Sequence, residues 1–163
     1  MLGGVVNKFQ GKLHTFGIEE EYLLLDEETG LPANRATEVI AAAAALGQTP
    51  EREFLSSQLE TATSICAAAS QAEAALREFR SQVSQAAVRC GVVLASTGLP
   101  PVGGETAGMI TPDARYRRIF TEMRGAAAHQ YVTGTHVHVE VPSRDSGRGS
   151  LPILLGGRPF CSL

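Results

Sequence analysis

The stretch FGIEEEYLLLD, residues 16–26, places three consecutive glutamates between strongly apolar flanks. In a strand the side chains alternate between two faces, so Glu19 and Glu21 share one face with Gly17 while Glu20 takes the other. The apolar flanks favour a central strand, where charged side chains need ionic partners or a metal ion. Two carboxylates whose Cα atoms are about 7 Å apart can hold one hard cation, or contribute to a two-metal site. A solvated pair of glutamates on an edge strand is the alternative.

A second strand is expected in YVTGTHVHVEV, residues 131–141, because polar and β-branched residues alternate along it. His136 and His138 share one face with Gly134, which would let a nucleotide approach the backbone closely, whereas Val137 and Val139 are predicted to face the core. A histidine pair of this kind is about as typical of a strand whose imidazoles contact only water as it is of a binding site. If a metal is bound, the many glutamates favour magnesium or manganese over a closed zinc site, which needs four nitrogen or sulfur ligands.

A second acidic pair, Glu53 and Glu60, lies in the segment PEREFLSSQLETATSIC. A helix start at Thr49-Pro50 is one reading of this segment, but its Thr, Ser and Ile content favours a strand. Residues seven apart on a regular strand face opposite ways, so both glutamates can serve one site only if the chain bends. We therefore predict that Glu53 lies in the loop before the strand that carries Glu60.

Three helices are predicted from apolar periodicity and end signals. The first spans residues 36–46 and ends at Gly47, and the second spans residues 70–90, with Ser70 and Glu73 as a capping box. The third begins at Thr111, as N-cap, before Pro112.

Composition and charge narrow the classes of protein to which this chain can belong. The chain has 163 residues, 44% hydrophobic and 19% charged, and a net charge of −3, which predicts a soluble globular domain. The absence of a basic block argues against nucleic acid as a partner, and no apolar run is long enough to span a membrane. The three cysteines form no metal or disulfide motif, which favours a reducing, cytoplasmic location.

Five segments follow one another in a fixed order: FGIEEEYLLLD, EREFLSSQLETATSIC, STGLPP, RYRRIF and GTHVHVEV. In this order they resemble the carboxylate–amine ligases, also called type 2 glutamate–cysteine ligases, over roughly residues 14–145. The resemblance implies an α+β fold in which an antiparallel sheet curves into a funnel with helices on its outer face, similar to glutamine synthetase and incomplete here. It also implies ATP-dependent formation of a γ-glutamyl amide from L-glutamate and an amine such as L-cysteine, through an acyl-phosphate intermediate. Formation of a homo-oligomer is left open.

The same resemblance implies roles for particular residues. The metal ligands, for Mg²⁺ or alternatively Mn²⁺, would be four glutamates: Glu19, Glu21, Glu53 and Glu60. His136 and His138 would bind the ATP cofactor or the metal. Glu60 and Arg115 would be catalytic, with Arg115 paired to a substrate carboxylate or phosphate, although a plain helix-surface role for Arg115 is equally open.

The resemblance also divides the chain. Residues 1–145 are expected to form the N-terminal part of a ligase catalytic domain, and residues 146–163, rich in glycine and proline, an irregular tail at an aberrant or truncated C-terminus. Because longer relatives carry further strands and a further metal-ligand glutamate, we expect this chain to be inactive or impaired by itself. Two other classes remain open: a non-catalytic fragment or binding module, and a metal-dependent hydrolase that uses the His-x-His pair.

Overall fold

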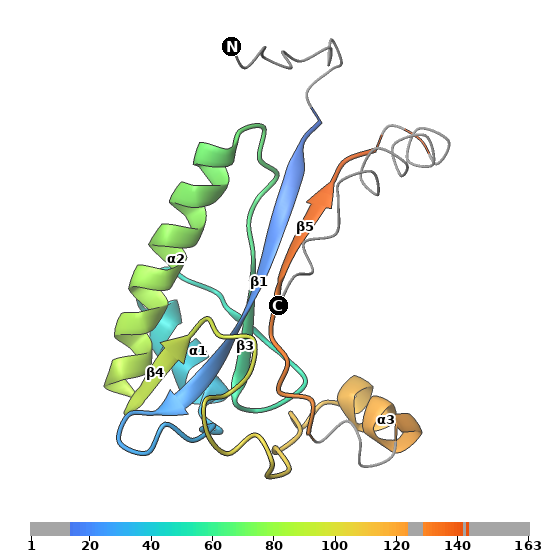
Figure 1. Ribbon diagram of the computed structural model, residues 1–163. Helices are drawn as coiled ribbons and strands as arrows, with labels where there is room; N and C mark the ends of the chain where they lie inside the picture. The colour runs from blue at the N-terminus through green and yellow to red at the C-terminus, as the bar shows by residue number, and fades with distance from the viewer. Residues whose placement is uncertain (1–13, 124–128, 142, 144–163) are drawn as a thin grey trace, which may run out of the picture.

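The computed structural model describes residues 14–123, 129–141 and 143, which build an antiparallel sheet with two helices packed on one face (Figure 1). Along the chain the elements are β1 (Phe16–Asp26), α1 (Ala36–Ala44), β2 (Glu51–Arg52), β3 (Gln58–Ala62), α2 (Ala69–Arg89), β4 (Val92–Ala95), α3 (Ala114–Met123) and β5 (Thr135–Val139). The predicted α+β class and antiparallel sheet are confirmed for this part of the chain. None of the helices described is long and apolar enough to cross a membrane.

Strand β1 lies in the centre of the sheet because it has neighbours along both edges. Strand β3 pairs with Glu19–Leu23 on one edge, and β2 continues the sheet beyond it. The other edge carries β5 along Phe16–Glu20 and β4 along Leu23–Asp26. The prediction of a central strand for FGIEEEYLLLD is therefore confirmed.

Alternation along β1 divides the core into two clusters. Tyr22 and Leu24 face α1 and α2, and the Tyr22 ring stacks on Phe79 with ring centroids 5.6 Å apart. Leu23 and Leu25 face the opposite side of the sheet and belong to the second cluster. The glutamates that precede these residues follow the same alternation, so the middle one points toward the helices and its two neighbours point away.

Helix α2 buries the predicted apolar stripe but begins differently. Its buried residues are Ala72, Leu76, Phe79, Val83, Ala86 and Ala87. The predicted capping box of Ser70 and Glu73 is wrong, because the helix already begins at Ala69. The Gln71 side-chain oxygen accepts the backbone N–H groups of Ala67 and Ala68 at 2.7 and 3.1 Å, and so caps the helix two residues earlier than predicted.

Helix α1 is shorter than predicted, and helix α3 begins later than predicted. Helix α1 ends at Ala44, and Gly47, with a φ of 80°, closes the turn that follows. Helix α3 begins at Ala114 instead of Thr111. The Asp113 carboxylate accepts the backbone N–H of Arg115, in the first turn of α3, at 2.7 Å. The Thr111 hydroxyl instead donates to the carbonyl oxygen of Glu53 at 2.6 Å.

Strand β5 contradicts the prediction for its valines. Val137 and Val139 are 59% and 56% exposed, so they do not face a core within the described residues. The reason is the position of β5, which pairs with β1 at the edge of the sheet and lies on the side of β1 away from α2 (Figure 1). The predicted tail, residues 146–163, lies outside the described residues.

Candidate metal-binding site

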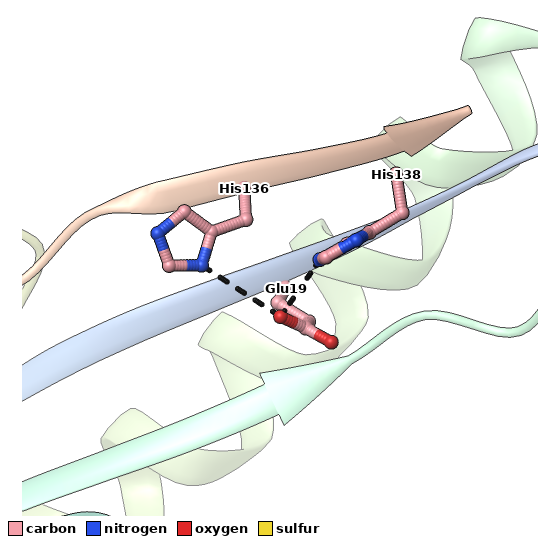
Figure 2. A group of neighbouring side chains, drawn as sticks. All are labelled: Glu19, His136 and His138. Atoms are coloured by element: carbon pink, nitrogen blue, oxygen red, sulfur yellow. Dashed lines mark hydrogen bonds and ion pairs between the residues drawn. The ribbon is translucent and has the colours of Figure 1, made fainter. Parts of the chain in front are cut away.

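A carboxylate and two imidazoles meet where β1 and β5 pair. The register places Glu19 opposite His136 and Gly17 opposite His138. The Glu19 Oε2 atom lies 2.9 Å from His138 Nε2 and 3.7 Å from His136 Nδ1 (Figure 2). One ligand atom from each residue lies within 4.8 Å of the other two, a spacing that suits a single metal ion. The predicted histidines are thus gathered around one predicted metal ligand.

The remaining predicted glutamates gather on the other side of Glu19. Glu21 and Glu60 lie directly opposite each other on β1 and β3. Glu53 lies in the connection between β2 and β3, which confirms the prediction that it precedes the strand of Glu60. Because of that connection, the Glu53 and Glu60 carboxyl groups are hydrogen-bonded to each other although the two residues are seven apart in the sequence.

Among the described residues, Glu21, Glu53 and Glu60 make no ion pair with a basic side chain, whereas Glu19 pairs with the two histidines. Burial, and after it the repulsion of three neighbouring glutamates, together raise the pKa of the Glu60 carboxyl to about 7. Glu53 acts through its charge and a hydrogen bond, whereas Glu19 and Glu21 act through charge. Like charges in a partly buried site disfavour ionisation unless a cation is present. The four glutamates therefore form one electrostatic unit, which we call the acidic cluster.

The backbone of Gly134 holds Glu21 in place. Its N–H donates to Glu21 Oε2 at 2.8 Å, and its carbonyl oxygen accepts the backbone N–H of Glu21 at 3.0 Å. The sequence predicts that Gly134 allows close approach of a nucleotide, but the close neighbour in the structure is a glutamate of the acidic cluster. A side chain of β1 is thereby fixed to the segment just before β5.

The ion pair between Glu20 and Arg80 lies on the face of the sheet opposite the acidic cluster, and it was not predicted from the sequence. Glu20 is 3% exposed and accepts from Arg80 Nε at 2.9 Å and from Arg80 Nη2 at 2.5 Å. Its carboxylate also accepts from the Tyr22 hydroxyl and, at 3.3 Å, from the Ser96 hydroxyl. Burial alone would raise the pKa of Glu20, but these donors and the Arg80 charge hold it below its ordinary value. The available sequence signal was the position of Arg80 four residues after Leu76, at the border of the apolar stripe.

Arg115 lies beside Tyr116, whose hydroxyl also experiences the charges of Glu53 and Glu60. It is exposed on α3, and its guanidinium carbon lies 5.6 Å from the centroid of the Tyr116 ring. Within the described residues it makes no ion pair with Glu19, Glu21 or their partners. Its predicted catalytic role, toward a substrate carboxylate or phosphate, stays a prediction.

A cavity of about 220 Å³ adjoins the acidic cluster on the side of α3. Its lining combines carboxylates, amides and apolar side chains: Glu21, Glu53, Phe54, Gln58, Ile119, Met123, Gln130 and Val132. A small polar substrate could therefore lie next to an ion held by the glutamates.

Comparisons with known proteins identify a family for the chain and several relatives. The model of glutamate–cysteine ligase family 2 matches residues 15–151. A Mycolicibacterium smegmatis protein named "Putative glutamate–cysteine ligase 2-3" is 43% identical over 132 residues, which is 81% of this chain and 36% of that protein. A protein of the same name numbered 2-1, from Rubrobacter xylanophilus, is 34% identical over 79% of this chain and 35% of its own length. One numbered 2-2, from Mycobacterium sp. strain KMS, is 35% identical over 86% of this chain and 40% of its own length. The chain thus spans two fifths or less of the length of these relatives.

Proposed function

Since this chain belongs to glutamate–cysteine ligase family 2, we propose that it supplies the metal-binding half-site of an ATP-dependent carboxylate–amine ligase. The reaction would join the γ-carboxylate of L-glutamate to an amine such as L-cysteine. ATP would activate the carboxylate as an acyl phosphate, which the amine then attacks. The finer fold that goes with this function, a curved sheet similar to that of glutamine synthetase, is part of the proposal.

The observation that carries the proposal is the acidic cluster. Glu19, Glu21, Glu53 and Glu60 come from two strands and a loop, and their repulsion, together with burial, raises the pKa of Glu60. Carboxylate oxygens are the ligands that a hard divalent cation prefers, and the compact set of ligand atoms at Glu19, His136 and His138 adjoins them. A protein that only folds around these residues would gain stability by replacing them, which makes a structural role a poor explanation.

Mg²⁺ or Mn²⁺ would be held by the acidic cluster, and the imidazoles beside Glu19 suit Mn²⁺ better than they suit Mg²⁺. When bound, the cation supplies positive charge that neutralises the phosphates of ATP during transfer of the phosphoryl group. The protein's own contribution is to orient the carboxylates: Gly134 fixes Glu21, and β5 brings the histidines to Glu19. The adjoining cavity would admit the amine or the glutamate side chain.

A metal-dependent hydrolase is the second candidate, and one observation favours it. Glu19, His136 and His138 alone form a compact set of one oxygen and two nitrogen ligands, which is a common arrangement for transition metals. Such an enzyme would act with zinc and without ATP. The family and the three further glutamates favour the ligase.

The proposal is tested by titrating the purified chain with Mn²⁺, with and without a non-hydrolysable ATP analogue. We expect saturable Mn²⁺ binding that the analogue strengthens, and loss of both in a Glu19→Gln, Glu21→Gln double variant. Glu28→Gln, in the exposed turn after β1, is the matched control and should bind as the parent does. Binding that survives in the double variant would contradict the metal assignment. Binding of zinc alone, with no effect of the analogue, would favour the hydrolase.

A further inference from the structure

Glu19 and Glu21 belong to the acidic cluster, whereas Glu20, the residue between them, is held on the opposite face of the sheet. Glu20 accepts hydrogen bonds from Arg80 on α2 and from Ser96, the residue after β4. It also accepts one from Tyr22 on its own strand. A single carboxylate therefore connects β1 to the helix layer and to the end of a neighbouring strand.

This connection fixes how β1 is rotated about its own axis. Successive side chains of a strand point to opposite faces, so holding Glu20 against α2 directs Glu19 and Glu21 away from it. A shift of one residue in register would turn both carboxylates to the wrong face. At this end of β1 apolar packing enforces the choice only weakly, because Phe16 and Ile18 line an open cavity beside α2 and are only partly buried.

Stability alone is a weak reason for such a pair. Removing a carboxylate from water costs free energy that its ion pair only partly offsets, and apolar residues at the same positions often give an equally stable protein. Helix α2 also carries the pair Arg77–Glu73, with a 2.6 Å contact, but both of those side chains are exposed and the pair lies within the helix. The Arg80–Glu20 pair differs because its carboxylate is buried and belongs to β1.

We propose that Arg80 is a positioning residue, which acts through Glu20 to hold Glu19 and Glu21 in the orientation that binds the metal ion. This inference rests on the proposed function, because it concerns the same metal site. Arg80 itself lies on the helix side of the sheet and touches neither the ion nor the substrate.

The test compares Mn²⁺ binding by Arg80→Lys and Arg77→Lys in the full chain, with folding followed by circular dichroism. Lysine keeps the positive charge but cannot make the bidentate hydrogen bonds that Arg80 donates to the Glu20 carboxylate. We expect Arg80→Lys to fold and to bind Mn²⁺ about tenfold more weakly, the lower end of the range for residues that orient metal ligands. Arg77→Lys should leave the dissociation constant within about twofold of the parent. A purely structural role would lower the melting temperature and leave the affinity of the folded chain unchanged.

The outcomes separate this inference from the proposed function. A parent chain that binds no Mn²⁺ overturns both. A parent that binds, together with a folded Arg80→Lys of unchanged affinity, overturns the positioning role alone. If Arg80→Lys does not fold, Tyr22→Phe decides, because it keeps the ring on Phe79 and removes one donor to Glu20. Weaker Mn²⁺ binding by that variant supports the positioning role, and unchanged binding overturns it.

Discussion

Glu21 and Glu60 face each other directly across β1 and β3, with like charges on the same side of the sheet. Opposed like charges destabilise a sheet, and here Glu53 adds a third carboxylate to the same place. The strand pairing that builds the fold thus concentrates negative charge at the position where a cation is expected. Substitutions in the acidic cluster therefore affect both cation binding and the stability of the metal-free chain.

Removal of one charge from the acidic cluster should stabilise the metal-free chain. Glu60→Gln keeps the size of the side chain and eliminates its repulsion by Glu21 and Glu53. We expect the free energy of unfolding to rise by up to about 1 kcal/mol, and Mn²⁺ binding to weaken by about tenfold or more. Denaturant unfolding and a Mn²⁺ titration measure the two effects.

The control for this substitution is Glu28→Gln, which removes an exposed charge outside the cluster. Neither its stability nor its Mn²⁺ affinity should change measurably. A Glu60→Gln variant that is less stable than the parent and binds Mn²⁺ equally well would show that Glu60 has a structural role.

The stability of the metal-free chain should fall as the pH rises toward neutrality. The folded chain retains the Glu60 proton up to a pKa of about 7, whereas the unfolded chain loses it near the ordinary value of 4.5. Between these values the folded state binds more protons, so this contribution to stability is lost as the pH rises through about 7 and is constant above it. Melting temperatures measured without metal, from about pH 5 to pH 8, should show the decline.

Comparison with Glu60→Gln isolates this residue, because the variant has no proton to lose and its profile should be flatter. Saturating Mn²⁺ should also flatten the profile of the parent, since a bound cation favours the ionised carboxylate. Parallel profiles for parent and variant would rule out Glu60 as the source of the pH dependence.

Local patterns in the sequence were sufficient to predict the central strand, its alternation and much of the acidic cluster. Apolar flanks around EEE indicated a central strand because such flanks are buried on both faces, and Tyr22 to Leu25 are indeed buried. The family resemblance implied that Glu53 and Glu60 serve one site. Side-chain periodicity then required a bulge, a bend or a loop between them, and the predicted loop position of Glu53 is the one observed.

Features that depend on distant partners were not predictable in this way. The Arg80–Glu20 contact joins residues 60 positions apart, and nothing near Glu20 in the sequence identifies its partner. The valines of β5 alternate as a buried strand would, but burial depends on which elements cover the strand. The start of α2 was misplaced because Gln71 can cap the helix with its longer side chain, so Ser70 is not needed for that role.

The exposed face of β5 predicts an asymmetry between two strand valines. Val139→Ala should change the free energy of unfolding by no more than about 0.5 kcal/mol, because the side chain is 56% exposed. Val92→Ala, in β4, should destabilise by about 2 kcal/mol, because that side chain is 2% exposed and packs in the core with α2. Denaturant unfolding of both variants checks the difference. Equal losses would mean that β5 is covered in solution.

The two histidines should contribute unequally to metal binding. His138 Nε2 lies 2.9 Å from Glu19 Oε2, whereas His136 Nδ1 lies 3.7 Å from the same atom. We therefore expect His138→Gln to weaken Mn²⁺ binding about tenfold and His136→Gln to have a smaller effect, with the exposed His129→Gln as the unchanged control. Isothermal titration with Mn²⁺ alone, and then with the ATP analogue, measures each. If both variants bind Mn²⁺ as the control does but lose the effect of the analogue, the histidines serve the nucleotide and the metal role assigned to them is wrong.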